Sequence, residues 1–153
     1  MAGDGEKLLE ETGLSYGRVL DRDLFFFLLD LEVKRSRRYQ NFLCLMLLKI
    51  KPFSINDNGE KRDTYDQILR DILKEETRDS DIIGSLGKNR LAVLLPYADL
   101  KAGDHVKSRF ENTLKYYELK DREFAIIFDQ VCFPINGADT MDFIKRALSP
   151  DPT

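Results

Sequence analysis

Apolar residues recur along this chain at two spacings, one typical of helices and one typical of buried strands. Residues 18–39 repeat apolar side chains at helical spacing and end in basic residues, where the helix dipole favours cations. The expected core-facing stripe is Leu20, Leu24, Phe27, Leu28 and Leu31. Further apolar residues, among them Phe25 and Leu29, widen this stripe. The pattern predicts a helix that lies deep in the core or meets a second partner.

Residues 42–50 form a continuous apolar run without helical phase, which predicts a central strand buried on both faces. The turn signal Asn56-Asp-Asn-Gly59 follows, and then a helix is predicted over residues 63–77. Its apolar stripe is Tyr65, Ile68, Leu69, Ile72 and Leu73.

Two short strand-like runs, 81–86 and 90–95, flank Gly87-Lys88-Asn89 and predict a β-hairpin that Pro96 closes. A helix over 99–118, a strand over 124–133 and a short helix over 140–148 complete the pattern, with Ala102 and Phe110 on the inner face of the first. The order α-β-α-β-β-α-β-α predicts an α/β fold with a mixed central sheet flanked by helices. The folded domain is expected over residues 12–148, between an N-terminal tail (1–11) and a C-terminal tail (149–153).

Length and composition narrow the class of protein. The chain has 153 residues, is 42% hydrophobic and 33% charged, and carries a net charge of −3, which fits one folded domain and argues against a nucleic-acid binder. We expect no membrane span and no signal peptide, and hence a cytoplasmic protein. Cys44 and Cys132 lie in apolar runs, so we expect two buried thiols in a reducing compartment rather than a disulfide.

Residues 78–96 carry the most specific motif of the chain. Arg78 and Asp81 are followed by five residues, then by Gly87-Lys-Asn-Arg-Leu91 and an apolar strand that ends at Pro96. This segment resembles the central hairpin of the GGDEF family, the diguanylate cyclase domains of bacterial cyclic di-GMP signalling, whose pattern is R-x-x-D, five residues, then G-G-D/E-E-F. Weaker matches in the same order are Thr12-Gly13-Leu14, Phe53, Ile55-Asn56-Asp57, Asp66–Leu69 and Phe133-Pro134. The resemblance covers residues 12–148 and implies a nucleotide-cyclase-like topology around the central hairpin.

The residues that the family uses for catalysis are replaced. The resemblance implies metal ions held by an Asp of a D-x-D motif on the first strand and by the acid at the third position of the signature. Lys49 and Lys51 stand in place of the D-x-D acids, and Asn89 and Arg90 in place of the two acids of the signature. Ammonium and guanidinium groups have no lone pair to offer a cation. We therefore expect no enzyme, no catalytic residue, no bound metal and no cofactor. Two alternatives remain for these cationic side chains and for that of Lys88. They bind phosphates directly, or they are solvated side chains at a site that has lost its function.

Three residues match the family's inhibitory site, which binds its product. Arg78 and Asp81 form the R-x-x-D motif, and Arg109 falls where a second arginine often completes the pocket. The resemblance implies arginine forks on guanine or phosphate and an aspartate that accepts hydrogen bonds from guanine. This requires Arg78 and Asp81 to point to solvent on the same side of the loop. The alternative is that they only close the loop and that Arg109 is a solvated flank of its helix.

Asn56 and Asp66 match residues of the family's substrate site, as vestigial nucleotide contacts. The alternative for Asn56 is that a turn of this composition needs no ligand. His105, the only histidine, is expected at the surface.

Two functions are open at this stage. The first is a catalytically inactive GGDEF-like signalling module that binds cyclic di-GMP at the R-x-x-D motif. The second is a module that binds no nucleotide and acts through protein contacts, with a partner protein, a neighbouring domain or a second copy. For the second, we expect Phe25 or Phe26 to be at least partly exposed and to lie in the interface.

Overall fold

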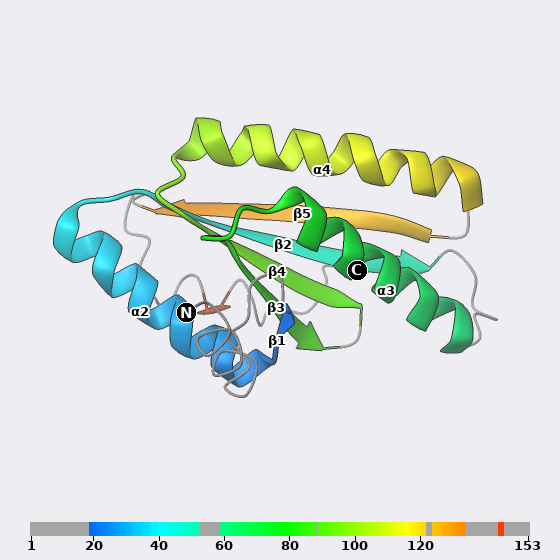
Figure 1. The fold of residues 1–153 in the computed structure, drawn as a ribbon, viewed down its shortest axis with the longest axis horizontal. Helices are drawn as coiled ribbons and strands as arrows, with labels where there is room; N and C mark the ends of the chain where they lie inside the picture. Colours follow the sequence, from blue (N-terminus) through cyan, green and yellow to red (C-terminus); the bar gives the residue numbers. More distant parts are fainter. Residues whose placement is uncertain (1–18, 53–58, 88, 122–123, 134–143, 146–153) are drawn as a thin grey trace, which may run out of the picture.

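The computed structural model describes residues 19–52, 59–87, 89–121, 124–133 and 144–145. Five strands form one mixed sheet in the order β1-β3-β4-β2-β5 (Figure 1). Its strands are β1 (Val19–Leu20), β2 (Leu43–Pro52), β3 (Ile82–Gly87), β4 (Arg90–Pro96) and β5 (Phe124–Phe133). The helices are α2 (Arg22–Tyr39), α3 (Gly59–Glu76) and α4 (Leu100–Asp121). The predicted α/β fold with a mixed sheet flanked by helices is confirmed.

The helices cover the sheet in two layers, with α2 on one face and α3 and α4 on the other (Figure 1). Each face has its own cluster of buried apolar side chains. Along β2, Leu43 and Leu45 pack toward α2, whereas Cys44 and Met46 pack toward α3 and α4. The prediction of a central strand buried on both faces is therefore confirmed, because its side chains alternate between two filled cores.

The hairpin is also confirmed. Strands β3 and β4 pair antiparallel, with a register irregularity between Ser85 and Gly87. Gly87 (φ 130°) and Asn89 (φ 63°) take positive φ in the turn, where glycine and asparagine have the lowest steric cost. The backbone N–H of Ile50 donates to the Asn89 carbonyl oxygen over 2.8 Å and ties the turn to β2.

The first predicted helix needs two corrections. It begins at Arg22, not at residue 18: the Asp21 carboxylate caps it by accepting from the Leu24 N–H at 2.9 Å. Val19 and Leu20 instead pair parallel with β3 as a short strand.

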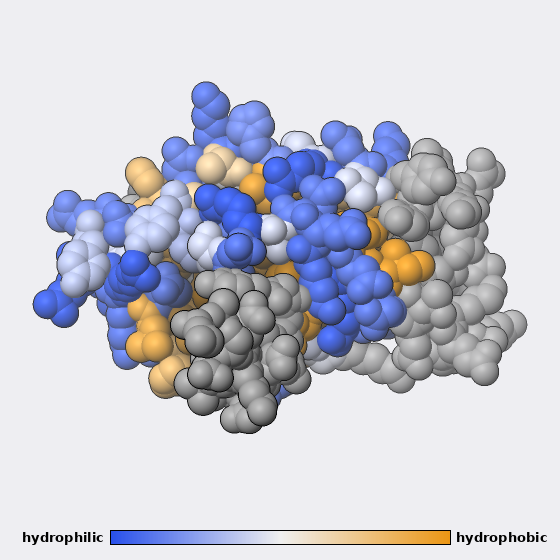
Figure 2. Space-filling model, viewed as in Figure 1, coloured by the Kyte–Doolittle hydropathy of each residue, from blue (hydrophilic) through white to orange (hydrophobic). Residues whose placement is uncertain are grey.

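The buried stripe of α2 is also different from the predicted one. Its core-facing residues are Phe25, Leu29, Val33 and Ser36. Phe27 and Leu31, predicted to face the core, are exposed, and Figure 2 shows apolar groups at the surface along α2. A Cβ on Gly84 of β3 would lie 2.4 Å from the Phe25 ring, so this glycine makes the space that selects Phe25 as the buried aromatic. The predicted exposure holds for Phe26, which is half-buried, and not for Phe25.

The later elements agree with the pattern within a few residues at each end. In α3, Leu69, Ile72 and Leu73 are buried as predicted. In α4, Phe110 is buried as predicted, but Gly103 rather than Ala102 faces the sheet. The side chains of Tyr65 and Tyr117 and most of the predicted helix 140–148 lie outside the described residues, as do the two tails.

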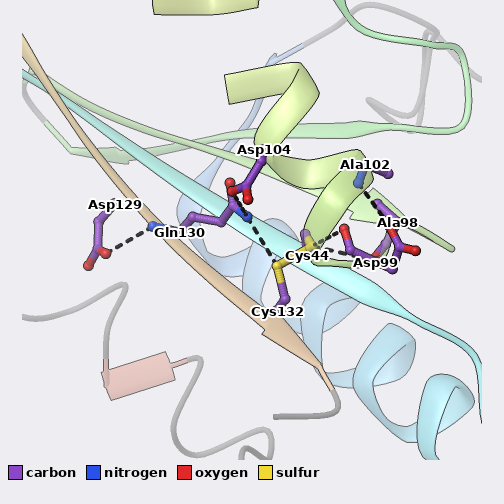
Figure 3. The surroundings of a disulfide bond; sticks show 8 residues. All are labelled: Cys44, Ala98, Asp99, Ala102, Asp104, Asp129, Gln130 and Cys132. Carbon is purple, nitrogen blue, oxygen red and sulfur yellow. Dashed lines mark hydrogen bonds between the residues drawn. A yellow bond between two sulfur atoms is a disulfide. The ribbon is translucent and has the colours of Figure 1, made fainter. Parts of the chain in front are cut away.

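The prediction of two free thiols is wrong, although both cysteines are buried. The register of β2 and β5 places Cys44 directly opposite Cys132, and the two form a disulfide (Figure 3). Helix α4 packs closely over this bond, since a Cβ on Gly103 would lie 2.9 Å from the Cys44 Sγ. The two cysteines are 88 residues apart, so sequence spacing gave no sign of the pairing.

Candidate functional site

Of the candidate site residues that the structure describes, most lie near the two ends of strand β3. Residues 76–81, which are the last residue of α3 and the loop after it, lead into the start of β3, and the hairpin turn follows the end of β3 (Figure 1). Because β3 has six residues, the two ends are about 20 Å apart. They are therefore two separate candidate sites.

The hairpin end brings cations together. Lys49 on β2 lies directly opposite Arg90 on β4, and both are partly buried. By the alternation of strand side chains, both lie on the α2 face of the sheet. Lys51 follows on the same face, opposite Ala125 of β5, and is exposed. Lys88 lies outside the described residues.

Asp66 lies on α3 and is already paired. Its Oδ2 accepts from Arg70 Nε at 2.7 Å, and Arg70 Nη2 also donates to Ser85 Oγ on β3 at 3.4 Å. The carboxylate thus helps to fix α3 over the sheet. Asn56, the other predicted vestigial contact, lies outside the described residues.

At the other end of β3, Arg78 and Asp81 form a reciprocal turn. The Asp81 N–H donates to the Arg78 carbonyl oxygen at 2.9 Å, and the Arg78 N–H donates to Asp81 Oδ2 at 2.9 Å. The guanidinium adds a third contact, from Nη2 to Asp81 Oδ1 at 3.1 Å, and a fourth to the Pro96 carbonyl oxygen at 3.4 Å. Asp81 therefore fixes both the backbone and the guanidinium of Arg78.

The two side chains of this motif differ in exposure. The Arg78 side chain is 62% exposed, whereas that of Asp81 is 3% exposed. The requirement that both point to solvent is met by the arginine and not by the aspartate. In this arrangement Asp81 holds Arg78, and the arginine alone offers polar hydrogen atoms to a ligand.

Arg109 contacts the opposite end of the same loop. Its Nε lies 2.9 Å from Glu76 Oε2, and its Nη2 donates to the Glu76 carbonyl oxygen at 2.6 Å. These bonds join α4 to the last residue of α3, and the guanidinium side chain stays 53% exposed. The structure thus places all three predicted ligand residues around the loop of residues 76–81.

Two residues beside this loop were not predicted. Tyr97 follows Pro96 with its ring exposed, and Arg35 of α2 contacts that ring. They are 62 residues apart, so only the fold brings them together. The position of a tyrosine directly after the strand-ending proline was the one available signal. His105 is exposed on α4, as predicted.

Comparison with known proteins identifies this architecture. Residues 16–148 match the family described as "Diguanylate cyclase, GGDEF domain". The chain therefore belongs to the GGDEF family. No curated protein matches the sequence.

Solved structures agree with this assignment at the level of the fold. The active GGEEF domain of a Vibrio cholerae diguanylate cyclase has a TM-score of 0.73 and 12% identity, over 85% of this chain and 86% of that one. The FimX GGDEF domain of Pseudomonas aeruginosa has a TM-score of 0.73 and 14% identity, over 85% of each chain. The GGDEF domain of Caulobacter crescentus DgcB, solved in complex with c-di-GMP, has a TM-score of 0.66 and 14% identity, over 85% and 81%.

As a GGDEF domain, the chain is a signalling domain, and both ends of β3 belong to it. Within the described part of the chain, no helix is long and apolar enough to cross a membrane.

Proposed function

We propose that this GGDEF domain is catalytically inactive and binds cyclic di-GMP at the Arg78 end of β3. The inactivity rests on the hairpin end, where Lys49 lies in register with Arg90. Joining two GTP molecules needs metal ions that neutralise the triphosphates and help to activate the attacking hydroxyl. Two cationic side chains in register repel a metal ion and offer it no lone pair.

The single observation that carries the binding proposal is the exposed Arg78 guanidinium, held by a buried carboxylate. An arginine fixed in this way loses little conformational freedom when it binds a phosphate or a guanine edge. Cyclic di-GMP offers two phosphates and two guanines. Arg109, exposed at the other end of the same loop, supplies a second fork.

Asp81 takes a different role in this proposal from the one implied by the motif. With its side chain buried and both oxygens accepting from Arg78, it positions the arginine and does not contact guanine. The c-di-GMP complex of the Caulobacter crescentus DgcB domain supports the choice of ligand, since that domain shares this fold.

A calorimetric titration tests the proposal. Wild-type protein should bind cyclic di-GMP, and Arg78→Ala should weaken binding about ten- to a hundredfold, since a charge-assisted hydrogen bond is worth about 1.5–3 kcal/mol. Arg22→Ala is the matched control, because Arg22 is an exposed arginine at the N-terminal end of α2. Thermal melting should show all three proteins folded.

Two results would overturn the proposal. One is the absence of heat with cyclic di-GMP at high micromolar concentration. The other is an equal loss of affinity in Arg22→Ala, which would show that general charge and not the Arg78 site holds the ligand. A parallel titration with GTP tests whether the cations at the hairpin bind phosphates.

A second function has one observation in its favour. Phe27 and Leu31 lie exposed one turn apart on α2. A homodimer formed through this helix would bury them and would need no nucleotide. Sedimentation of wild-type protein and of the double variant Phe27→Ser, Leu31→Ser decides this: a wild-type dimer that the double variant abolishes, together with no binding of cyclic di-GMP, would favour the interaction module.

A further inference from the structure

Tyr97 has an unusual backbone and an exposed ring. It lies between β4 and α4 with a backbone φ of 64°, in the left-handed region that residues other than glycine and asparagine rarely adopt. The residue is 54% exposed, so burial of the ring does not offset this cost. Strained positions of this kind collect at functional sites, because folding alone rarely favours them.

The ring is held in place from α2. Arg35 Nη2 donates to the Tyr97 hydroxyl, and its guanidinium carbon lies 5.4 Å from the ring centroid. Arg35 in turn pairs with Glu32 at 3.5 Å on its own helix. The tyrosine is therefore an aromatic surface fixed by a neighbouring side chain and still open to solvent.

This surface adjoins the Arg78 site. The carbonyl oxygen that Arg78 Nη2 contacts belongs to Pro96, the residue immediately before Tyr97. In Figure 1 the loop into β3, the end of β4 and the C-terminal end of α2 meet at the same end of the sheet. An exposed guanidinium and an exposed aromatic ring thus flank one peptide unit.

We propose that Tyr97 is a stacking platform for one guanine of cyclic di-GMP while Arg78 holds the adjacent phosphate; this rests on the proposed function. Nucleotide sites pair a cation for the backbone phosphate with an aromatic ring for the base. The base contacts the part of the ring that Arg35 leaves open. Arg35 acts as the positioning residue that keeps the ring in place.

A purely structural role for Tyr97 is the competing explanation. The pair of Arg35 and Tyr97 also links α2 to the connection between β4 and α4. Such a link would change thermal stability when it is lost, and it would leave the affinity for nucleotide unchanged.

Affinity measurements on two variants separate the two roles. Tyr97→Ala should weaken cyclic di-GMP binding about five- to a hundredfold, the range for loss of one base–aromatic stack. Tyr97→Phe keeps the ring and should bind within about threefold of wild type, because stacking does not need the hydroxyl. Thermal melting of each variant checks that the fold is retained.

Fluorescence gives a direct signal of the contact. The chain contains no tryptophan, so Tyr97→Trp places a single indole at the site. Cyclic di-GMP should quench its emission saturably, with the dissociation constant found by calorimetry. Phe27→Trp is the control, since Phe27 is an exposed aromatic residue in the first half of α2, 12 residues before its C-terminal end. Its emission should not change.

The outcomes distinguish this inference from the proposed function. If wild-type protein binds cyclic di-GMP, Arg78→Ala weakens binding and Tyr97→Ala does not, the stacking platform is wrong and the receptor proposal stands. If Tyr97→Trp shows no quenching at saturating ligand, the platform is wrong as well. If wild-type protein binds no cyclic di-GMP, both proposals fail.

Discussion

The two ends of strand β3 carry different sets of charged residues. At the start of β3, Arg78 pairs with Asp81 and Arg109 pairs with Glu76, yet both guanidinium groups stay more than half exposed. At the hairpin end, Lys49 lies in register with Arg90. One end has two arginine–carboxylate pairs around a loop, and the other has two cationic residues in register on neighbouring strands.

This difference between the two ends shows which residues determine the fold. Both ends belong to one sheet whose register follows from alternating apolar residues, such as Leu45 and Met46, that fill two cores. The charged residues at the two ends of β3 are not part of that apolar pattern. The pattern therefore leaves the residues at each end free to differ without a change of fold.

The largest expected effect is the absence of synthesis. With GTP and magnesium or manganese, the purified domain should make no cyclic di-GMP, because the cationic groups of Lys49, Lys51 and Arg90 offer a metal ion no lone pair and Asn89 supplies no negative charge. Chromatographic detection of the product checks this, with an active GGDEF domain as the positive control. Product above the no-enzyme background would show that the hairpin end is catalytically active, contrary to the proposal.

A methyl group in the middle of β3 should disturb both ends together. Gly84→Ala places a Cβ 2.4 Å from the fully buried Phe25 ring, so we expect a loss of about 3 kcal/mol in unfolding free energy. Urea denaturation measures it, and Phe25→Leu in the same background should recover part of the loss. A neutral Gly84→Ala would show that α2 does not pack on β3 as described.

The Arg78–Asp81 pair should be asymmetric in stability. Asp81→Ala removes a buried acceptor of two hydrogen bonds and should cost about 1–3 kcal/mol. Arg78→Ala removes the exposed guanidinium but keeps the backbone N–H that donates to Asp81 Oδ2, so it should cost less than Asp81→Ala. Urea denaturation of both variants compares them. A larger loss for Arg78→Ala would mean that the arginine is the structural residue and not the ligand contact.

The smallest effect is expected at the hairpin end. Lys49→Ala should change the affinity for cyclic di-GMP by less than about twofold, because effects of sites this far apart are usually independent. Calorimetry beside Arg78→Ala measures it. A tenfold loss in Lys49→Ala would place the ligand at the hairpin instead.

The sequence predicts most of the fold because strands and hairpins depend on local signals. The apolar run of β2 and the turn at Gly87 and Asn89 fix their elements without knowledge of the rest of the chain. Local signals could not predict which side of α2 faces the core. Its first half is apolar on more than one side, and Gly84, 59 positions after Phe25, decides which side is buried.

The sequence predicted which residues belong to the candidate site, but it did not predict how they are arranged. Arg78, Asp81 and Arg109 do gather around one loop, as the family motif implies. The burial of Asp81, however, depends on how the loop packs, and the pairing of Tyr97 with Arg35 needs two elements far apart in the chain. The bond between Cys44 and Cys132 likewise depends on strand register.

An amide-resolved NMR titration with cyclic di-GMP tests the contrast between the two ends most directly. Saturable shifts should gather in residues 76–81, at Tyr97 and around Arg109, and the amides of Gly87, Asn89 and Arg90 should stay unchanged. Shifts centred on the hairpin, or no shifts at millimolar ligand, would contradict the assignment of binding to the Arg78 end.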